Sequence, residues 1–184
     1  MSPVPAPVPD PALVERAADV DDALRLLYPD ARCALEHEGP FQLLVATVLS
    51  AQTTDARVNT VTPELFRRWP DAVSLSQADV IALTDLLRPL GMQRTRAERL
   101  VSLGQALAER HDGEVPTERD ALVVLPGVGR KTANVVLGNA FAQPAITVDT
   151  HVGRLSRRLG WTTSKDPVRV EKDIAALWEP WRWT

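Results

Sequence analysis

With 184 residues, 45% of them apolar, the chain is long enough to bury a core, and its one cysteine, Cys33, excludes an intramolecular disulfide. Its longest apolar run, Leu43–Leu49 interrupted by Thr47, is too short to cross a membrane, and its start lacks a secretory signal, so we expect a soluble, cytoplasmic protein. The net charge of −3 does not exclude DNA binding, because residues 1–40 hold 8 acidic and 3 basic side chains and the rest is slightly basic.

Helical periodicity runs through the chain, interrupted by proline, glycine and capping residues, and no segment alternates as a half-buried strand does. The proline-rich residues 1–12 predict a flexible tail. An apolar stripe over Leu13–Leu27 predicts a first helix, which Pro29 ends. The segment Pro40–Ser50 is apolar nearly all round and predicts a helix in the middle of a bundle. We therefore expect an all-α protein.

Further helices are predicted along the rest of the chain. Two pairs of side chains, Ser76 with Asp79 and Thr117 with Asp120, resemble capping boxes and indicate where helices begin. Pro63 should kink the helix that contains it or begin a new one. The expected helices are residues 54–69, 76–87, 95–111, 121–125, 130–141, 150–159 and 167–178.

Residues 117–140 predict a helix, the turn LPGVG and a second helix that begins at Gly129 or Arg130. The first N–H groups of a helix have no partners within it, and the helix dipole adds positive potential there, so a phosphate can bind. This pattern resembles the helix-hairpin-helix motif of DNA-binding proteins. The candidate DNA-contacting residues are Gly127, Val128, Gly129 and Arg130. The alternative interpretation is a plain connector between packed helices.

A second motif follows at a fixed distance, because ITVDTHVGRLSRRL places Asp149 18 residues after Lys131 of LPGVGRKTANVVLG. Two further segments accompany it, LLVATVLSAQTTD at 43–55 and HDGEVP at 111–116. In this order the motifs resemble the endonuclease III family of base-excision repair enzymes, over about residues 33–184. The resemblance implies a DNA glycosylase with abasic-site lyase activity that removes oxidised pyrimidines. It also implies a monomer whose partner is duplex DNA holding a damaged base or an abasic site.

The resemblance implies the helix-hairpin-helix DNA glycosylase fold, with a helical barrel domain at residues 33–143 and a second helical domain at 13–32 and 144–184. Most relatives end with four cysteines that hold a [4Fe-4S] cluster, but no cysteine follows Cys33, so this chain alone ligates no cluster. A cluster is expected only if the natural protein extends beyond Thr184. We therefore expect the second domain to be incomplete, and no dissociable metal to take part in the reaction.

The resemblance assigns Lys131 as the nucleophile that attacks the sugar C1′ and forms a Schiff base, after which β-elimination breaks the strand. It assigns Asp149 as the partner, which either stabilises positive charge on the sugar or accepts a proton. From the residues alone, Lys131 could instead pair with a phosphate, and Asp149 could serve only as the N-cap of its helix. The sequence leaves these alternatives open.

The resemblance implies further residues that contact DNA. A base must be rotated out of the duplex before it can be cut off, and Gln52 would enter the vacated space. Met92 stands where relatives usually carry a leucine that wedges into the opposite strand. Arg94, with Arg96 and Arg99, could contact phosphates. The alternatives are that Gln52 merely ends the buried helix, that Met92 packs in the core and that the arginines are simply solvated.

Two residues are second-tier candidates. Asp55 lies one helical turn beyond Ala51 and either faces Lys131 or is the acidic first residue of its helix, while His151 stands in the VDTH motif. Two other functions stay open at this point, a monofunctional adenine-type DNA glycosylase and a non-catalytic DNA-binding remnant of the family. Lys131 weighs against the first, because adenine-type enzymes generally lack this lysine.

Overall fold

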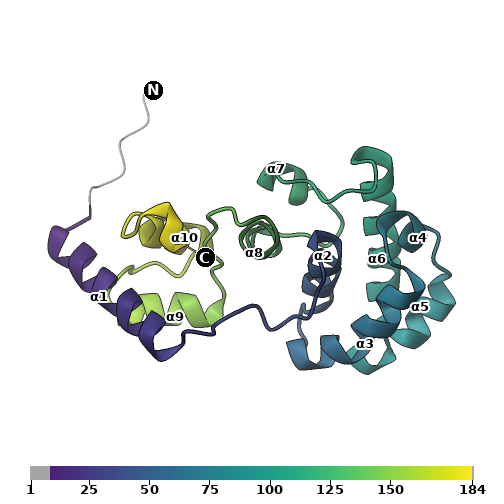
Figure 1. Cartoon of the computed structure of the whole chain (residues 1–184), viewed down its shortest axis with the longest axis horizontal. Helices are drawn as coiled ribbons and strands as arrows, with labels where there is room; N and C mark the ends of the chain where they lie inside the picture. Colours follow the sequence, from purple (N-terminus) through teal and green to yellow (C-terminus); the bar gives the residue numbers. More distant parts are fainter. Residues whose placement is uncertain (1–8, 184) are drawn as a thin grey trace. The chain divides into compact units, whose positions relative to one another are not determined.

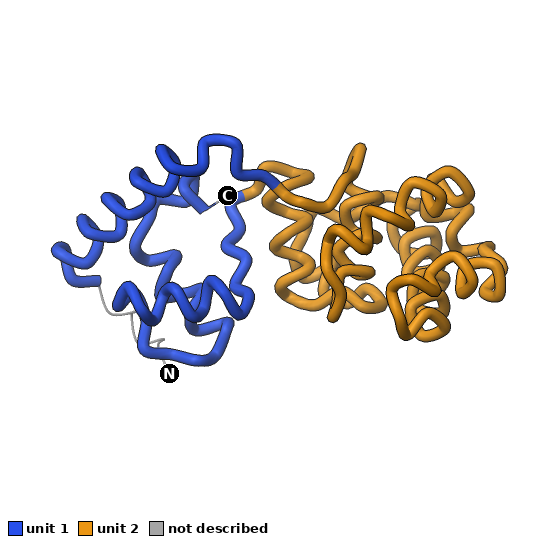
Figure 2. The backbone as a smooth tube through the Cα atoms, turned by 90° about the horizontal axis from the view of Figure 1, so that it is seen from below, with its two compact units in different colours: residues 1–32, 144–184 blue, residues 33–143 orange. Residues whose placement is uncertain are grey.

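The computed structural model describes residues 9–183, so most of the predicted tail, residues 1–8, lies outside the described part of the chain. Throughout residues 9–183 the only regular structure is helical, as expected, with helices α1 to α10 and two short 3-10 helices, η1 and η2 (Figure 1). The chain divides into two compact units, which Figure 2 colours separately. Unit 1 comprises the residues up to 32 and those from 144, and unit 2 comprises residues 33–143.

Unit 2 is built around one buried helix. α2 (Pro40–Leu49) packs against α3 (Asp55–Arg68) and α8 (Arg130–Phe141), and seven consecutive residues of α2, Leu43–Leu49, are buried. The prediction of a central helix is therefore confirmed. The other helices of unit 2 are α4 (Ala72–Ser76), α5 (Val80–Leu86), η1 (Arg88–Leu90), α6 (Gln93–Arg110) and α7 (Arg119–Leu122). Among these, α6 packs against both α4 and α5.

The first predicted capping box in unit 2 is wrong. Ser76 does not begin a helix but is the last residue of α4, and the capping box of α4 is formed by Asp71 and Ser74. α5 begins after Asp79, whose carboxylate accepts hydrogen bonds from two N–H groups of the first turn at 3.1 and 3.3 Å. The acidic residue was therefore the informative one, because a single carboxylate can cap a helix without a reciprocal partner.

Two further expectations for unit 2 differ from the structure. The N-cap of α7 is Glu118, and no side chain caps this short helix, so the predicted pair of Thr117 and Asp120 is wrong. α3 contains Pro63 and remains one α-helix from Asp55 to Arg68, so Pro63 does not begin a new helix. Pro63 is exposed, and helix packing on the opposite face keeps α3 continuous although one backbone hydrogen bond is lost.

Unit 1 combines the segments on either side of unit 2. Its helices are α1 (Pro11–Leu27), α9 (Thr150–Arg158), α10 (Pro167–Ala175) and η2 (Pro180–Arg182). One apolar cluster holds Ala17 of α1 against Trp161 and Leu177. Trp161 and Trp178 meet edge to face, with ring centroids 4.9 Å apart. A second cluster consists of Ile146, Val170 and Ile174.

α1 ends at Leu27, before Pro29, as expected, but its start and the burial of its last turn differ from the sequence-based expectation. The helix begins at Pro11, inside the predicted tail, because the Asp10 carboxylate caps it with a hydrogen bond of 3.0 Å and proline suits a first turn. At the other end the apolar stripe is not buried throughout, since Leu24 is 44% exposed and Leu27 is 70% exposed. The cluster that covers α1 reaches only to Val20, so the last turn lies beyond it.

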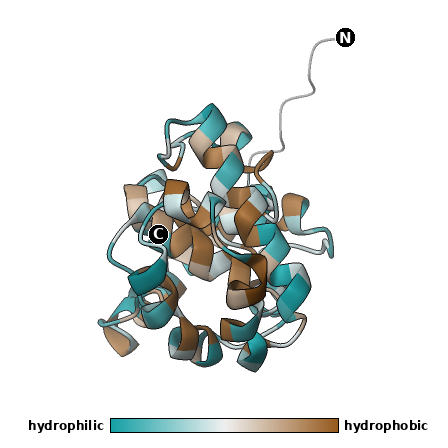
Figure 3. Ribbon diagram, turned by 90° about the vertical axis from the view of Figure 1, so that its right-hand side faces the viewer, coloured by the Kyte–Doolittle hydropathy of each residue, from teal (hydrophilic) through white to brown (hydrophobic). Residues whose placement is uncertain are grey.

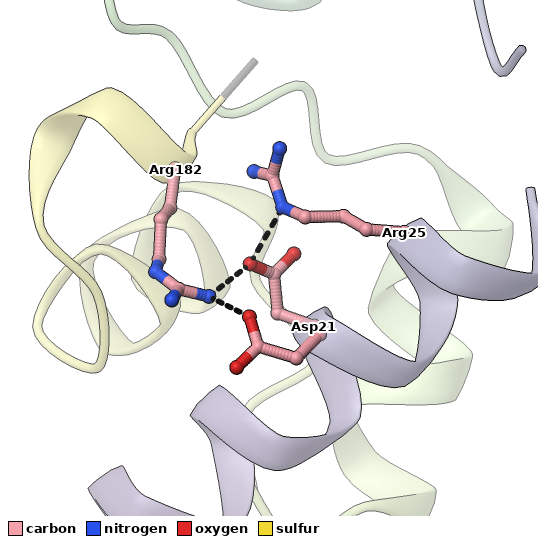
Figure 4. A network of polar contacts seen from close by, with 4 residues as sticks. Asp21, Arg25 and Arg182 are labelled. Carbon is pink, nitrogen blue, oxygen red and sulfur yellow. Dashed lines mark hydrogen bonds and ion pairs between the residues drawn. The ribbon is translucent and has the colours of Figure 1, made fainter. Parts of the chain in front are cut away.

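Ion pairs tie the C-terminal part of unit 1 to α1 (Figure 4). Arg182 Nη1 donates to Asp21 Oδ2 at 2.6 Å and to Asp22 Oδ1 at 2.7 Å, and Arg25 Nε donates to the same Asp21 oxygen at 3.0 Å. The two carboxylates raise the pKa of the Arg182 guanidinium. The network thereby joins residues that lie 160 and 161 positions apart in the chain.

Several of the longer helices, such as α3 and α6, bury one face and expose the other. In Figure 3 brown and teal segments alternate along individual helices, as amphipathic helices require. None of the helices in residues 9–183 is long and apolar enough to cross a membrane. The largest fully buried side chains are Leu43, Leu44, Leu49, Leu65, Leu75, Leu83, Leu87, Leu100, Leu103, Leu107, Leu122 and Ile174.

Gly104 allows α6 to approach α4 closely, and this contact can be tested. A Cβ at Gly104 would lie 2.7 Å from the backbone N of Ser76 and 2.9 Å from the carbonyl O of Ala72. We expect Gly104→Ala to lower the free energy of unfolding by about 1–3 kcal/mol, because backbone atoms cannot yield as a side chain can. Urea denaturation would measure this. Ser102→Ala, on the exposed side of α6, is the control and should change stability by less than about 0.5 kcal/mol; equal effects would contradict the prediction.

Candidate nucleic-acid interface

The turn LPGVG joins α7 to α8 in unit 2. Leu125 and Val128 are buried and fix the turn to the core. Gly127, between them, has a φ of +81°, a left-handed conformation that favours glycine. A Cβ at Gly127 would overlap the aliphatic part of Arg99 and lie 3.2 Å from Val48 Cγ1. Gly127 is therefore required by its backbone conformation and by its packing.

Gly129 meets neither requirement in the folded chain. Its φ is −97°, which other residues adopt freely, and a Cβ built on it has nothing within 4 Å. Gly129 is the N-cap of α8, and no side chain accepts a hydrogen bond from the first N–H groups of that helix at this cap. The missing Cβ also leaves space beside this helix start, and the helix dipole adds positive potential there. The start of α8 is thus a candidate site for an anion such as a phosphate.

Lys131 is exposed in the first turn of α8, directly beside this anion site. Among the described residues of unit 2, no carboxylate forms an ion pair with its amine. Asp55 is also exposed and is the first residue of α3, where an acidic side chain suits the helix dipole. The interpretation of Asp55 as the acidic start of its helix fits this position, and a role opposite Lys131 stays a prediction.

Asp149 belongs to unit 1, where it is the N-cap of α9. Its Oδ1 accepts hydrogen bonds from the N–H groups of His151 (2.9 Å) and Val152 (2.8 Å). Both bonds use the same oxygen, and within the described residues of unit 1 no group donates to Oδ2. The predicted cap is therefore present, and it holds the carboxylate in one orientation with one oxygen left for a ligand. The exposed ring of His151 interacts through Nδ1 with Arg154 at 3.2 Å.

Gln52 and Met92 lie in two turns of unit 2 and share an unusual backbone. Their φ values are +60° and +46°, left-handed conformations that residues with long side chains rarely adopt. Met92 is 55% exposed, so the alternative that it packs in the core is wrong. Gln52 is exposed as well, in the turn that follows α2. Each turn therefore presents a side chain to solvent.

The three arginines near the start of α6 have different environments. Arg94 is exposed and its Nε pairs with Glu98 Oε1 at 2.9 Å, so a phosphate would compete with this carboxylate. The aliphatic part of Arg99 covers Gly127. Arg96 is only 5% exposed, so the expectation that it contacts phosphates is wrong.

Arg96 instead binds three backbone carbonyls. Its Nη1 donates to Leu49 O at 2.6 Å, its Nη2 to Ala51 O at 2.7 Å and its Nε to Gly91 O at 2.9 Å. Burial lowers the pKa of this guanidinium, and the charge of Arg99 lowers it further. The sequence does contain a signal for this burial, because position 96 lies one helical turn before Leu100, on the same apolar face as Leu100, Leu103 and Leu107.

Known proteins share this arrangement of helices and motifs. Residues 45–180 match the family model for the HhH-GPD superfamily base excision DNA repair protein. Endonuclease III of Synechocystis sp. is 49% identical over 164 residues, a match that covers 89% of this chain and 75% of that protein. Endonuclease III of Bacillus subtilis is 46% identical over 154 residues, which cover 83% of this chain and 70% of that protein.

Solved structures give the same result. The structure of a trapped endonuclease III–DNA covalent intermediate has a TM-score of 0.87 and 42% sequence identity, over 92% of this chain and 80% of that chain. A thermostable thymine-DNA glycosylase, only 20% identical, has a TM-score of 0.80 over 90% of this chain and 80% of that chain. The second similarity concerns the fold alone.

The two glycines of the turn LPGVG, Gly127 and Gly129, should respond differently to substitution by alanine. We expect Gly127→Ala to lower the free energy of unfolding by about 1–3 kcal/mol, because the new Cβ strains a left-handed backbone and displaces Arg99. Gly129→Ala should change the free energy of unfolding by less than about 1 kcal/mol, because alanine tolerates this conformation and restricts the unfolded chain, which offsets its weaker preference for the N-cap position. Thermal and urea denaturation of both variants would measure this. A large loss in Gly129→Ala would show that this glycine serves folding.

Proposed function

Because the chain belongs to the endonuclease III family within the HhH-GPD superfamily, we propose that it is a DNA glycosylase with abasic-site lyase activity, a bifunctional enzyme of base-excision repair. Its substrate is duplex DNA that holds an oxidised pyrimidine or an abasic site. The observation that carries the proposal is the exposed side chain of Lys131, which stands in the first turn of α8 directly after the turn LPGVG, whose last residue, Gly129, caps the helix without a side chain. The proposal includes a cytoplasmic location, at the nucleoid.

DNA binding is proposed to begin at the backbone rather than at the bases. A phosphate that accepts hydrogen bonds from the first N–H groups of α8 is held without regard to sequence, which suits an enzyme that must scan all DNA. Val128 is buried and keeps the turn rigid, while the missing Cβ at Gly129 leaves room for the phosphate oxygens. Arg130 and Arg94 are the proposed charged contacts to neighbouring phosphates.

The proposed reaction starts with the amine of Lys131, which attacks C1′ of the damaged nucleotide in its neutral form. The Nζ–C1′ bond forms and the glycosidic bond breaks, so the base leaves with the electron pair and takes up a proton. Opening of the C1′–O4′ bond, with protonation of O4′, gives a Schiff base. Loss of a proton from C2′ then expels the 3′ phosphate by β-elimination, and water releases the lysine.

Asp149 is proposed as the charged partner in this reaction. Its carboxylate either stabilises positive charge that develops on the sugar or accepts the proton of the attacking amine. Two capping hydrogen bonds to Oδ1 orient the group in advance, so no rearrangement of the side chain is needed during the reaction. His151, two residues after Asp149 in the first turn of α9, is proposed only as a secondary contact to DNA.

A duplex base must leave the stack before Lys131 can reach its sugar. We propose that Gln52 enters the vacated space, where its amide can hydrogen-bond to the orphaned base. Met92 is proposed to wedge into the opposite strand, since methionine adapts to irregular gaps. The exposure of both side chains supports these roles.

The [4Fe-4S] cluster that the family resemblance implies does not fit the residues present. Such a cluster requires four thiolates, and the 184 residues contain one cysteine, Cys33. In residues 9–183 no group of three or more histidine, cysteine, aspartate or glutamate side chains is placed to hold a metal ion. No step of the proposed reaction passes through a cluster or a metal.

Borohydride trapping tests the nucleophile directly. The chain contains three lysines, Lys131, Lys165 and Lys172, so few amines compete for the Schiff base. On duplex DNA with an abasic site or thymine glycol we expect a covalent protein–DNA product, and Lys131→Gln should reduce it by at least about 100-fold. Lys165→Gln and Lys172→Gln, both exposed, are controls that should keep it. A full yield of adduct from Lys131→Gln would refute the assignment, and no adduct from folded, DNA-binding wild type would remove the lyase activity.

Two substitutions of Asp149 separate its charge from its capping role. Asparagine caps helices about as well as aspartate, so Asp149→Asn should keep the melting temperature while excision slows by about 100-fold through loss of charge. Asp149→Ala should lose the same activity and also about 0.5–2 kcal/mol of stability, because the cap is gone. Single-turnover excision rates and thermal melts would measure both. A wild-type rate in Asp149→Asn would mean that Asp149 acts only as a cap.

A further inference from the structure

One side chain of unit 2 reaches both turns that carry the proposed wedge residues. Arg96 donates to the carbonyl of Ala51, the residue before Gln52, and to the carbonyl of Gly91, the residue before Met92. From this geometry we infer that Arg96 is a positioning residue, which fixes the backbone of Gln52 and Met92 in the wedge conformation before DNA binds. The inference rests on the proposed function.

The hydrogen bonds act at the right point of each turn. A peptide group is planar, so its carbonyl oxygen and the N–Cα bond of the following residue move together. When Arg96 holds the carbonyl of Ala51 at 2.7 Å, it also orients the N–Cα bond about which Gln52 adopts its φ of +60°. The bond to Gly91 at 2.9 Å has the same effect on Met92, whose φ is +46°.

Both conformations need such support. A left-handed backbone costs an ordinary residue free energy because its Cβ crowds the carbonyl oxygen, and neither Gln52 nor Met92 is a glycine. Met92 also stands as the N-cap of α6 without a side-chain capping bond. The third hydrogen bond of Arg96, to Leu49 O at 2.6 Å, connects both turns to the end of the buried α2.

Folding alone does not explain a charged side chain at this position. Arg96 is 5% exposed, and within the described residues of unit 2 no carboxylate pairs with it. Burial of a charge is costly, and an apolar side chain would continue the face formed by Ala97, Leu100 and Leu103. The planar guanidinium instead offers donors in several directions at once, which suits three carbonyls from two turns. Burial lowers the pKa of Arg96, which reflects the same cost.

The expected benefit is pre-organisation. Side chains that must fill the space of a displaced nucleotide bind more tightly if their backbone is already ordered, because the ordering entropy is not lost on binding. Arg96 would therefore matter for opening a duplex, and much less for a substrate that has no base stack to open. This difference separates a positioning role from a general role in stability.

The test compares two substrates and two variants of Arg96. Arg96→Lys keeps the charge but not the planar fork, and Arg96→Met removes both; Arg110→Met, at the exposed end of α6, is the control. We expect borohydride trapping at an abasic site in duplex DNA to slow by about 10-fold to 100-fold in both variants. Trapping at an abasic site in single-stranded DNA should change by less than about threefold, and Arg110→Met should match wild type on both.

A second measurement makes the result specific to the wedge residues. Fluorescence of 2-aminopurine opposite the abasic site reports on the unstacked partner base, and its increase on protein binding should fall in Arg96→Lys. In a Gln52→Ala/Met92→Ala background, Arg96→Lys should cost no further activity on duplex DNA, because the residues it positions are gone.

Three outcomes would overturn the inference. These are an equal loss on both substrates, no loss on duplex DNA, and an additive loss in the Gln52→Ala/Met92→Ala background. Melting curves show whether each variant is folded at the assay temperature. If Arg96→Met does not fold, the result for Arg96→Lys alone decides the question. Failure of the proposed function has a different result, since wild type would then form no adduct on either substrate while the 2-aminopurine signal could still compare the variants.

Discussion

Seven consecutive side chains of α2, Leu43–Leu49, are buried, so this helix cannot shift without disrupting the core of unit 2. The candidate interface of unit 2 depends on that fixed position. Val48 limits the space at Gly127, the last carbonyl of α2 accepts a hydrogen bond from Arg96, and the turn with Gln52 follows the end of this helix. A rigid apolar helix thereby places the turn at Gly127, the buried Arg96 and the exposed turn with Gln52, three features that share no sequence motif with one another.

The two proposed catalytic residues both stand at helix starts, and the two starts are used in opposite ways. At α8, glycine in the N-cap position leaves the first amides without a side-chain acceptor, which favours an anion from outside the protein. At α9, Asp149 itself is the anion, and two amides bind its Oδ1. The same kind of backbone group is therefore the proposed phosphate site in one unit and orients a carboxylate in the other.

The sequence predicts those features that depend on local pattern. The buried α2, the start of α8 and the cap by Asp149 follow from periodicity, glycine and N-cap preference over a few residues. Arg96 was misplaced although its position lies on the apolar face of its helix, because two of its hydrogen-bond partners are carbonyls 45 and 47 positions away and no local pattern shows that they are there. The exposed Leu27 has the same cause, since periodicity shows which face is apolar but not how far a neighbouring cluster extends.

The pairing of Arg182 with Asp21 and Asp22 has a consequence for the order in which the chain acquires structure during synthesis. Unit 2 is continuous in sequence, so all its residues are available once residue 143 has left the ribosome. α1 is made before unit 2, but its partners around Trp161, Leu177 and Arg182 are made after unit 2. The apolar face of α1 therefore stays uncovered until these partners are made, and because closing so long a loop is slow, we expect unit 1 to form only after unit 2 has folded.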